Sequence, residues 1–356
     1  MEIKLLDSNQ ERNEWHNIIE KMPEKLQDIY FMPEYINLHS QEFGSKGLLF
    51  SAQEGDKIWL YAFILRQIFN IGDHKFDEII YDIETVYGYG GPITNTMNKE
   101  FIDSANDSFV QWCIDNSVIT EFVRFHPLIQ NQNCFSPDMN ILYDRNTVSI
   151  DLDNLTESGL KVDQKTRNMF RRAEKLGVHV SDYSSCDDFE KFVNLYLSTM
   201  IKLNAEDYYL FNNEYFDSLK ALVKSNGWLY VAELDGKWVA ASIFLRGKYL
   251  LHYHLSASDL EHRIQGSTNI LISHAATRGR EKGFLRLHLG GGRTISPSDS
   301  LLIFKRKMAT DVHSFYIGKR IHDMGTYSML CDIWKKKYPQ LLNIHGNKLL
   351  CYRYTN

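Results

Sequence analysis

In the C-terminal half of the chain, hydrophobic residues first alternate with polar ones and later recur at every third or fourth position. The runs Trp228–Leu234 and Lys237–Arg246 have the period of strands, and Asp235 and Gly236 between them are typical of a tight hairpin. A third strand-like run, Tyr249–Ala257, follows directly. This part of the chain therefore predicts three consecutive strands.

The loop Arg263–Thr268 follows the third strand and has the form Arg-x-x-Gly-x-Thr. A helix is predicted from about Asn269 to Lys282, and Gly283 is its expected stop. Phe284–Leu289 has the pattern of another strand, which ends at three consecutive glycines, 290–292. Taken alone, the loop is compatible either with ligand binding or with an ordinary connection into a helix. The order of the elements around it favours ligand binding.

The N-terminal half contains a second hairpin pattern that matches the first. Residues 48–66 align without gaps with residues 228–246, and the predicted turn of each lies at the same place. Identical residues fall at Leu49 and Leu229, Ala52 and Ala232, Lys57 and Lys237, Leu65 and Leu245, and Arg66 and Arg246. Short hairpins converge easily, but a match this regular favours a duplicated unit. Only the second copy carries the glycine-containing loop.

The remaining pattern predicts mainly helices, with a domain boundary near residues 150–160. A buried strand is predicted at Glu121–Phe125 and a terminal strand near Lys348–Tyr354. Helices are expected at residues 11–30, from Pro33 onward, and at 100–117, 165–177, 187–200, 215–223, 301–308 and 327–338, with Asp299 or Ser300 as the N-cap of the helix at 301–308.

Composition places the chain among globular proteins of two domains. It has 356 residues, of which 44% are hydrophobic and 24% charged, and its net charge of −5 gives no global basic signature for nucleic acid. The five cysteines are widely spaced, without a Cys-x-x-Cys motif, and indicate free thiols in a reducing cytoplasm. No apolar run approaches the ~20 residues that a membrane-spanning helix needs.

A basic helix is predicted within Lys165–Gly177. On it Arg167 and Arg171 lie one turn apart on one face, and Arg172 adds a further positive charge. Such a face is compatible either with plain solvation or with binding of a phosphate group, which the planar guanidinium does well.

Two glycine-rich stretches are candidate ligand loops. The first is Tyr87-Gly-Tyr-Gly-Gly-Pro92, where Tyr87, Tyr89 and Gly90 either bring the backbone close to a ligand or simply pack into a tight turn. The second is the triple glycine, in which Gly291 and the following Arg293 are candidates for contact with substrate. It lacks the Gly-Lys-Ser/Thr of a phosphate-binding P-loop.

Alternation on the strand Tyr249–Ala257 directs His252 and His254 to one face and Tyr253 to the other. The sequence contains no third ligand at metal-site spacing, so we predict no metal. Tyr253 and His254 are instead candidates to assist deprotonation of an amine. No Gly-x-Ser-x-Gly nucleophile elbow is present, which favours direct transfer without a covalent enzyme intermediate.

The order of three strands, Arg-x-x-Gly loop, helix and strand resembles the central motif of GNAT-type acyltransferases. In that family the loop wraps the pyrophosphate of an acyl-CoA, and the helix N-terminus favours the same negative charge. The resemblance implies Arg263, Gly266, Ser267, Thr268 and Asn269 as donor-binding residues. The family usually has Gly or Ala where this chain has Thr268.

A wider set of segments resembles the Fem-type branch of the GNAT superfamily, which includes peptidoglycan-bridge aminoacyltransferases. The segments are Tyr30–Tyr35, Tyr87–Pro92, Lys165–Gly177, His252–Ala257, Leu289–Gly292 and Phe304–Lys307, in the family's order. The resemblance implies an α/β (α+β) fold of two tandem GNAT-like lobes, each a mixed, mainly antiparallel sheet flanked by helices, with a cleft between them. We expect the lobes at residues 1–152 and 153–344, with the run 345–356 returning to the first.

Phe304 and Lys305 match the family's Phe-Lys motif, whose lysine is implicated in steadying charge during acyl transfer. The chemistry agrees, because a fixed ammonium lowers the barrier to an oxygen that becomes negative. Spacing alone favours an ordinary surface lysine on a short amphipathic helix, and the family match favours the catalytic role.

These observations predict a cytoplasmic N-acyltransferase that acts on an amine of a cell-envelope precursor, such as an amino sugar nucleotide or a peptidoglycan stem peptide. Acyl-CoA, for example acetyl-CoA, is favoured as donor by the loop at Arg263–Thr268. Aminoacyl-tRNA is favoured by the resemblance to bridge-forming enzymes, so tRNA is a possible partner. A protein that only binds a glycan or peptide is a third alternative.

Overall fold

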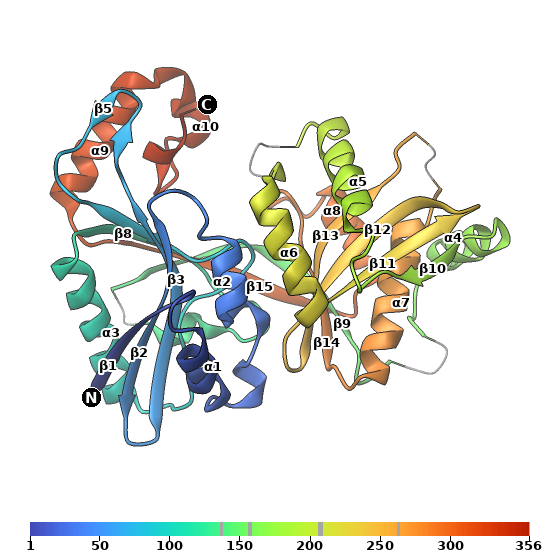
Figure 1. The fold of residues 1–356 in the computed structure, drawn as a ribbon, viewed down its shortest axis with the longest axis horizontal. Coiled ribbons are helices and arrows are strands. Elements are labelled where there is room, and N and C mark those ends of the chain that lie inside the picture. Colours follow the sequence, from blue (N-terminus) through green and yellow to red (C-terminus); the bar gives the residue numbers. More distant parts are fainter. Residues whose placement is uncertain (136–137, 156–158, 206–208, 262–263, 356) are drawn as a thin grey trace. The chain divides into compact units, whose positions relative to one another are not determined.

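The structure is a computed structural model that describes residues 1–135, 138–155, 159–205, 209–261 and 264–355 (Figure 1). The chain divides into two compact units. The first unit comprises Met1–Leu26, Tyr30–Asp144 and Phe315–Asn356, and the second comprises Gln27–Ile29 and Arg145–Ser314.

The sheet of the first unit has the strand order β1-β2-β3-β6-β8-β15. Its strands are β1 (Glu2–Asp7), β2 (Ser45–Glu54), β3 (Lys57–Gln67), β6 (Tyr81–Glu84), β8 (Val118–Arg124) and β15 (Asp311–Ile321), with the short β7 (Ile93–Thr94) beside β3 and a separate hairpin of β4 (Asn70–Ile71) and β5 (His74–Lys75). Neighbouring strands are antiparallel, except that β6 and β8 are parallel. The crossover between these two contains α3 (Lys99–Asp115).

The longer helices of the first unit each bury one face. Phe109 of α3 packs among the rings of Phe50, Tyr61 and Phe63 from β2 and β3. The other helices are α1 (Arg12–Glu20), α2 (Pro33–Leu38), α9 (Met324–Lys337) and α10 (Leu342–His345), with 3₁₀ turns at Glu24–Leu26, Ile29–Phe31, Asn131–Cys134, Pro339–Leu341 and Cys351–Arg353 (η6).

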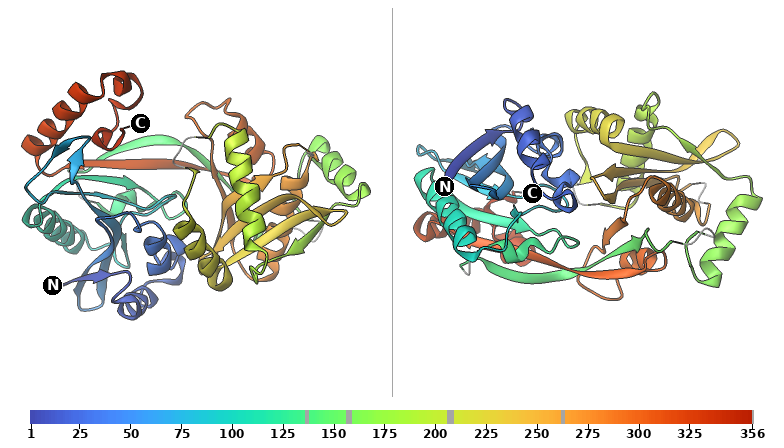
Figure 2. Two further views of the ribbon diagram at one scale, coloured as in Figure 1. Left: turned by 45° about the horizontal axis from the view of Figure 1, so that its top comes forward. Right: turned by 90° about the horizontal axis from the view of Figure 1, so that it is seen from below.

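The sheet of the second unit has the order β10-β11-β12-β13-β14-β9. The strands are β9 (Asn140–Asp151), β10 (His179–Asp182), β11 (Gly227–Leu234), β12 (Lys237–Arg246), β13 (Leu250–Ser258) and β14 (Arg286–Gly291). The helices are α4 (Gln164–Lys175), α5 (Phe189–Lys202), α6 (Asn213–Asn226), α7 (Ser267–Glu281) and α8 (Ser300–Arg306). Within this unit α5 and α6 cover one face of the sheet and α7 covers the other (Figures 1 and 2).

The two units repeat one pattern of strand pairing. In each, an edge strand, a hairpin and a fourth strand are antiparallel, a helical crossover leads to a parallel fifth strand, and an antiparallel sixth strand follows. The hairpins β2–β3 and β11–β12, whose sequences align, occupy the same place in the two orders. The duplication inferred from residues 48–66 and 228–246 therefore has a counterpart in the topology.

The sixth strands are long, and each contributes residues to both units. Residues 140–144 of β9 belong to the first unit and the rest of β9 to the second, where it pairs with β14. Conversely, β15 begins in the second unit and pairs with β8 in the first. The sequence suggested lobes at 1–152 and 153–344 with a return at 345–356; in the structure the chain rejoins the first unit from Phe315.

The α/β fold class, with mixed, mainly antiparallel pairing of strands and flanking helices, is confirmed. Most elements lie within a few residues of their expected bounds. The hairpin at Asp235–Gly236 has both residues at positive φ, 50° and 71°, as its sequence predicts. Gly283 follows the end of α7 with φ of 81°.

The helix expected over residues 11–30 is wrong beyond Glu20. α1 ends there, and Pro23 follows within three residues. Proline lacks the N–H that a continuing helix needs, so the chain passes into 3₁₀ turns instead.

The terminal strand expected near Lys348–Tyr354 is also wrong. This stretch forms local turns, in which Cys351 N–H bonds to the Lys348 carbonyl and Tyr354 N–H to the Cys351 carbonyl. Four consecutive residues, 349–352, are buried, which a strand with one exposed face does not allow. The Tyr352 hydroxyl bonds to Thr120 and Asp82 of the first-unit sheet.

Candidate active site

Strands β13 and β14 of the second unit run side by side for only a short distance. Their parallel pairing covers Leu250–His252 and Arg286–His288. Beyond these pairs β13 continues to Ser258 and β14 to Gly291, and no ladder pairs join them in the described chain. The backbone N–H and C=O groups on the two facing edges are therefore placed to bond a ligand rather than a strand.

A β-bulge lies where the two strands part. Ile243 of β12 is opposite Leu255, whereas the next residue, Phe244, is opposite Tyr253, so His254 is the additional residue. Bulges re-aim side chains and end regular pairing. Because the carboxyl ends of parallel strands lie at one edge, the loops after β13 and β14 meet at this edge of the sheet.

The start of α7 follows β13 at that edge. Its N-cap is Gly266, with φ of 96°, and no side chain caps the first turn among the described residues. A Cβ atom on Gly266 would lie 3.1 Å from the carbonyl oxygen of Met169 in α4. Glycine is thus required both by the backbone angle and by the close approach of α4. The uncapped first turn of α7 favours an anion.

Two of the predicted donor-binding side chains are held by local hydrogen bonds. The Ser267 hydroxyl donates to the Ile264 carbonyl at 2.9 Å, and the Thr268 hydroxyl lies 3.2 Å from that of Ser258 at the end of β13. The branched side chain of Thr268 is therefore turned toward β13. Asn269 is buried, and Arg263 lies outside the described residues.

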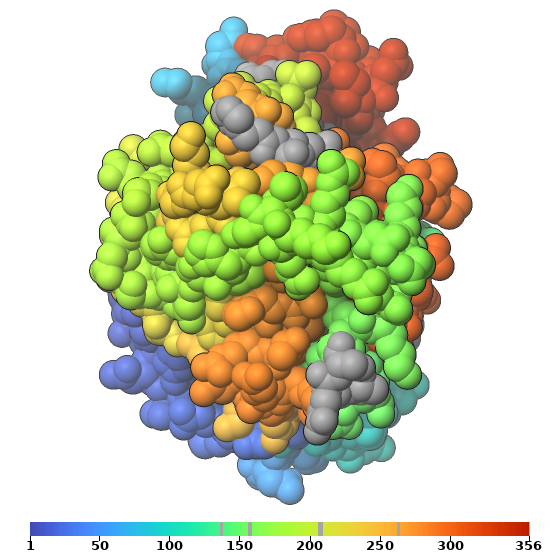
Figure 3. Space-filling model, turned by 90° about the vertical axis from the view of Figure 1, so that its right-hand side faces the viewer, coloured from blue at the N-terminus to red at the C-terminus, as the bar shows by residue number. Residues whose placement is uncertain are grey.

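The basic helix α4 lies on the surface next to α7 (Figure 3). Its N-cap Asp163 accepts the N–H of Thr166 at 2.6 Å. Arg167, Arg171 and Arg172 are exposed, and Arg167 donates to the Val162 carbonyl at 3.3 Å. Contact between Met169 and Gly266 brings this arginine-rich helix to the start of α7.

Lys305 lies on α8, which follows the strand end on the β14 side. The lysine is 8% exposed, and its Nζ donates to the Gly291 carbonyl at 2.8 Å. Burial lowers the pKa of Lys305 to about 8, against a smaller opposite effect of the Asp299 carboxylate. The Nζ also lies 5.9 Å from the centre of the Tyr253 ring.

Asp299 orders both α8 and the loop before it. One carboxylate oxygen accepts the N–H groups of Leu301 and Leu302, and the other accepts those of Arg293 and Thr294. A Cβ on Gly292 would lie 2.5 Å from this carboxylate, so only glycine allows the approach. The sequence predicted Asp299 only as a helix cap. No sequence pattern predicted that its carboxylate also accepts hydrogen bonds from the loop at Arg293.

The triple-glycine loop is further held by Arg145 of β9, whose guanidinium donates to the carbonyls of Gly292 and Arg293 at 3.0 and 2.8 Å. The Arg293 side chain itself is exposed. Arg145 was not among the sequence candidates, because an arginine in a loop-like stretch has no distinctive spacing.

The other catalytic candidates are divided between the two faces of the second-unit sheet. Tyr253 and Phe304 pack against the core beneath α7, and the centre of the Tyr253 ring lies 5.6 Å from that of Phe244. His254 instead contacts α6, where its Nε2 lies 3.0 Å from the Tyr215 hydroxyl. Burial lowers the pKa of His254 to about 3, so its imidazole is neutral at physiological pH. The structure brings Lys305 together with Tyr253, not with His254.

A buried carboxylate and imidazole form a pair that the sequence analysis missed. Asp28 belongs to Gln27–Ile29, the short N-terminal piece of the second unit, and its Oδ2 lies 2.9 Å from Nε2 of His252. Both side chains are 1% exposed. The Lys248 N–H bonds to the Gln27 carbonyl and secures the same segment. No pattern links residue 28 with a strand more than 200 positions later.

The Tyr87–Pro92 stretch belongs to the first unit. The Tyr87 carbonyl accepts from the Tyr35 hydroxyl at 2.8 Å. Tyr89 is buried, with its ring edge-on to Tyr30 and Phe315. Gly90 N–H bonds to the Arg124 carbonyl at 2.7 Å. Packing therefore accounts for much of this motif.

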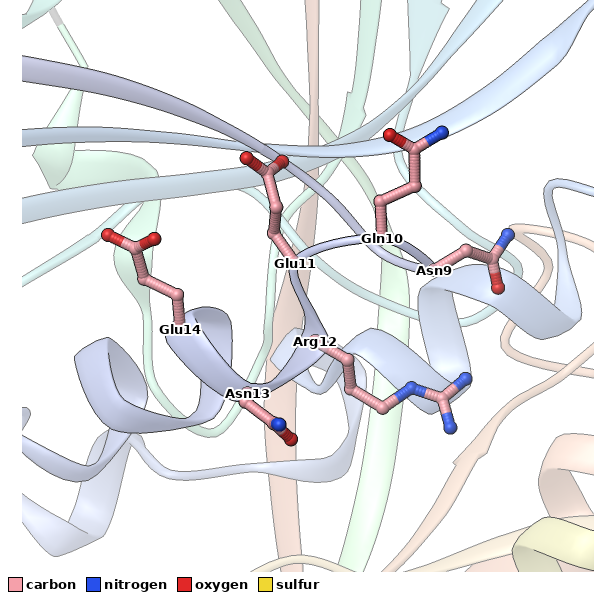
Figure 4. Close-up of a pocket in the computed structure, with 6 residues that line it drawn as sticks. All are labelled: Asn9, Gln10, Glu11, Arg12, Asn13 and Glu14. Atoms are coloured by element: carbon pink, nitrogen blue, oxygen red, sulfur yellow. The ribbon is translucent and has the colours of Figure 1, made fainter.

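A surface hollow in the first unit does not carry a site. Figure 4 shows its six lining residues, Asn9 to Glu14, which come from the turn after β1 and the first turn of α1 and fan outward rather than converge. Two of these side chains have local partners: Glu11 accepts the Asp7 N–H, and Arg12 Nε lies 3.7 Å from a carboxylate oxygen of Glu34. No helix in the described chain is both long and apolar enough to cross a membrane.

Comparisons of sequence and fold show which known proteins this chain is similar to. Residues 161–299 match the family described as Acetyltransferase (GNAT) domain. The chain is similar to the UDP-N-acetylmuramoylpentapeptide-lysine N(6)-alanyltransferase of Weissella viridescens, at 21% identity over 271 residues that cover 70% of this chain and 79% of the relative.

Solved structures share the fold over nearly the whole chain. FemX superposes with a TM-score of 0.66 and 12% identity, covering 92% of this chain and 99% of that one. L-PGS from Bacillus licheniformis superposes with a TM-score of 0.60 and 12% identity, covering 91% and 96%.

Residues 161–299 therefore carry a GNAT acetyltransferase domain. Over nearly its whole length, the chain has a fold similar to that of FemX.

Proposed function

We propose that this enzyme transfers an acyl or aminoacyl group to an amine of a peptidoglycan or other cell-envelope precursor. The single observation that carries the mechanism is the buried Lys305, whose Nζ rests on Gly291 at the edge where β13 and β14 separate. The alanyltransferase relative, which by its name acts on a lysine of a muramoyl pentapeptide, supports a stem-peptide amine as the acceptor.

The donor is held at the start of α7 in this proposal. Gly266 keeps the loop close to α4, and the first-turn N–H groups of α7 attract a negatively charged group. The exposed Arg167, Arg171 and Arg172 extend the positive field along α4 and attract phosphate groups of donor or acceptor. Ser267, Thr268 and Asn269 line the same turn, and Arg263 completes the motif in sequence.

The carbonyl to be attacked would lie between the separated strands. As the acceptor amine adds to that carbonyl, its oxygen becomes negative, and the Lys305 ammonium stabilises the charge. With a pKa of about 8, Lys305 is mostly protonated at neutral pH, as this role requires. Phe304 and Tyr253 limit water access on the same face, because both pack against the core there.

The proton leaving the amine has two candidate acceptors. Neutral His254 has the required form but lies on the α6 side of the sheet. Burial raises the pKa of Tyr253, so it remains a neutral phenol and can relay a proton but not act as a phenolate. The proposal gives Tyr253 the closer position, because it shares a face with Lys305.

Acyl-CoA and aminoacyl-tRNA remain the two candidate donors. The uncapped α7 turn suits the pyrophosphate of CoA. The alanyltransferase activity of the relative favours an aminoacyl donor. A protein that only binds its ligand has no evident need of a buried lysine with a lowered pKa, which favours catalysis over that alternative. Either donor fits a cytoplasmic enzyme that uses no metal.

The test is thermal unfolding with acetyl-CoA, CoA or charged tRNA. A ligand at 100 times its Kd stabilises the protein by about 2.7 kcal/mol. A shift with CoA compounds alone identifies an acyl-CoA enzyme, and a shift with charged but not uncharged tRNA identifies an aminoacyltransferase. No shift with either donor, together with no transfer, would overturn the proposal.

A further inference from the structure

Two buried thiols of the first unit face each other, outside the candidate active site of the second unit. Cys331 lies in α9 and Cys351 in the 3₁₀ turn η6, and their Sγ atoms are 3.6 Å apart. They are 7% and 2% exposed. A disulfide has an S–S distance of about 2.05 Å, so the two sulfurs need to approach each other by about 1.5 Å to form one.

The surroundings shift the pKa values of the two thiols in opposite directions. The contact with Cys351 lowers the pKa of Cys331, and the Tyr327 hydroxyl and Lys335, each one helical turn away, lower it further. The same contact and burial raise the pKa of Cys351. The thiolate is the reactive form of cysteine, so Cys331 is suited to attack an oxidant and Cys351 to act second.

The other cysteines lack this arrangement. Burial raises the pKa of Cys113, Cys134 and Cys186. Each of these thiols is therefore a poorer nucleophile than Cys331 at neutral pH. Cys186 is buried like Cys331 but lies in the second unit, which makes it a matched control.

We propose that Cys331 and Cys351 are a modification site at which a hydroperoxide forms a reversible disulfide. The Cys331 thiolate attacks one peroxide oxygen, the O–O bond breaks, and hydroxide leaves while Cys331 becomes a sulfenic acid. Cys351 then attacks that sulfur, the S–O bond breaks, and water leaves. In total two thiols lose two electrons and two protons, and hydrogen peroxide is reduced to two waters.

The bond would fasten η6, whose neighbouring side chains bond to the first-unit sheet, to α9. Next to Cys351, Tyr352 bonds to Asp82 at 3.0 Å, and Arg353 donates to Asp82 and Glu84 at 2.7 and 2.9 Å. Joining η6 to α9 restricts the unfolded chain and keeps these contacts from opening. The oxidant must be small, because both sulfurs are buried.

The experiment treats the full-length protein with hydrogen peroxide, alkylates the remaining thiols, and counts them by intact mass. The expected result is a fall from five alkylated thiols to three, with the unreduced peptide map showing Cys331 joined to Cys351. The oxidised protein should unfold several degrees higher, and dithiothreitol should reverse both changes. Cys331 should react roughly tenfold faster than Cys186.

Variants separate this site from general oxidation. Cys351→Ser should leave Cys331 as a sulfenic acid that dimedone traps, whereas Cys186→Ser should form the disulfide as the wild type does. Unchanged thiols, oxidation spread evenly over the cysteines, or disulfides between chains would each overturn the proposal. The wild-type peptide map decides the matter even if a variant fails to fold.

Discussion

The ammonium of Lys305 donates a 2.8 Å hydrogen bond to the carbonyl of Gly291, which joins α8 to the end of β14. This contact fixes the one buried lysine of the described core at the edge where the sheet opens. Its position depends on Asp299, which holds both the start of α8 and the loop after Gly291. The proposed chemistry rests on this arrangement.

Replacing Lys305 with alanine should lower kcat about 100- to 1,000-fold, the usual cost of losing a group that stabilises a developing oxyanion. KM for either substrate should change far less, because the charge is needed mainly in the transition state. Steady-state kinetics measure both. Lys307 is an exposed residue at the C-cap of the same helix, so Lys307→Ala is the control and should retain activity.

The pH dependence of activity should identify the protonated lysine. Because the pKa of Lys305 is about 8, kcat should decline above that pH as the ammonium is lost. Lys305→Arg keeps its charge throughout, so any residual activity should lack this decline. An unchanged alkaline limb in the arginine variant contradicts the assignment.

The same lowered pKa should affect folding. Between pH 8 and its unfolded value near 10.5, Lys305 binds fewer protons in the folded than in the unfolded protein. The contribution of this group to the free energy of unfolding therefore rises with pH across that window. Denaturant unfolding of wild type and Lys305→Met should show the rise in the wild type only; Lys307→Met should behave as the wild type does.

Asp299 offers a pair of variants that separate its roles. Asp299→Ala removes the helix cap and should cost about 0.5–2 kcal/mol in the free energy of unfolding. Asp299→Asn keeps a capping oxygen but removes the negative charge that raises the pKa of Lys305. Its alkaline limb should therefore shift to lower pH, as that of Asp299→Ala should, but with a smaller loss of stability. An unchanged alkaline limb in Asp299→Asn would argue against the charge interaction.

Gly266 should be required for donor binding beyond its effect on folding. Gly266→Ala strains the backbone and places Cβ 3.1 Å from Met169, which displaces α4 from the α7 start. Gly283 also has positive φ but has open space around it. Gly283→Ala therefore introduces the backbone strain without a steric clash and serves as the control. Calorimetry with the donor should show weaker binding only for Gly266→Ala; equal binding by both would place the donor elsewhere.

The α4 arginines should act through charge. Arg171→Gln combined with Arg172→Gln should weaken binding of the phosphorylated substrate and reduce its dependence on salt. Arg280→Gln, on the exposed far end of α7, is the control and should leave both unchanged. Fluorescence titration at two salt concentrations distinguishes these results.

Local pattern was sufficient for much of the fold. The Asp235–Gly236 hairpin, the Pro33 helix start and the Asp299 cap follow from the chemistry of single residues. The helix predicted over residues 11–30 was too long, because the structure ends α1 at Glu20, shortly before Pro23. The run 348–354 looked like a strand, although tertiary packing and side-chain bonds to Asp82 hold it in turns.

The site depends on relations that periodicity does not encode. A strand pattern over Tyr249–Ala257 does not indicate where pairing with the adjacent strand ends. The separation of β13 from β14 was therefore not predictable. The pairing of Asp28 with His252 joins distant segments. The roles assigned to Lys305, the α7 loop and the α4 arginines remain predictions.

The most direct measurement is single-turnover transfer of a labelled acyl or aminoacyl group to a muramoyl pentapeptide precursor, with acetyl-CoA and charged tRNA as alternative donors. We predict formation of an amide by the wild-type enzyme with one donor class and a loss of about 100-fold or more in rate for Lys305→Ala. Full activity of that variant, or no amide from either donor with any envelope-precursor amine tested, would contradict the account.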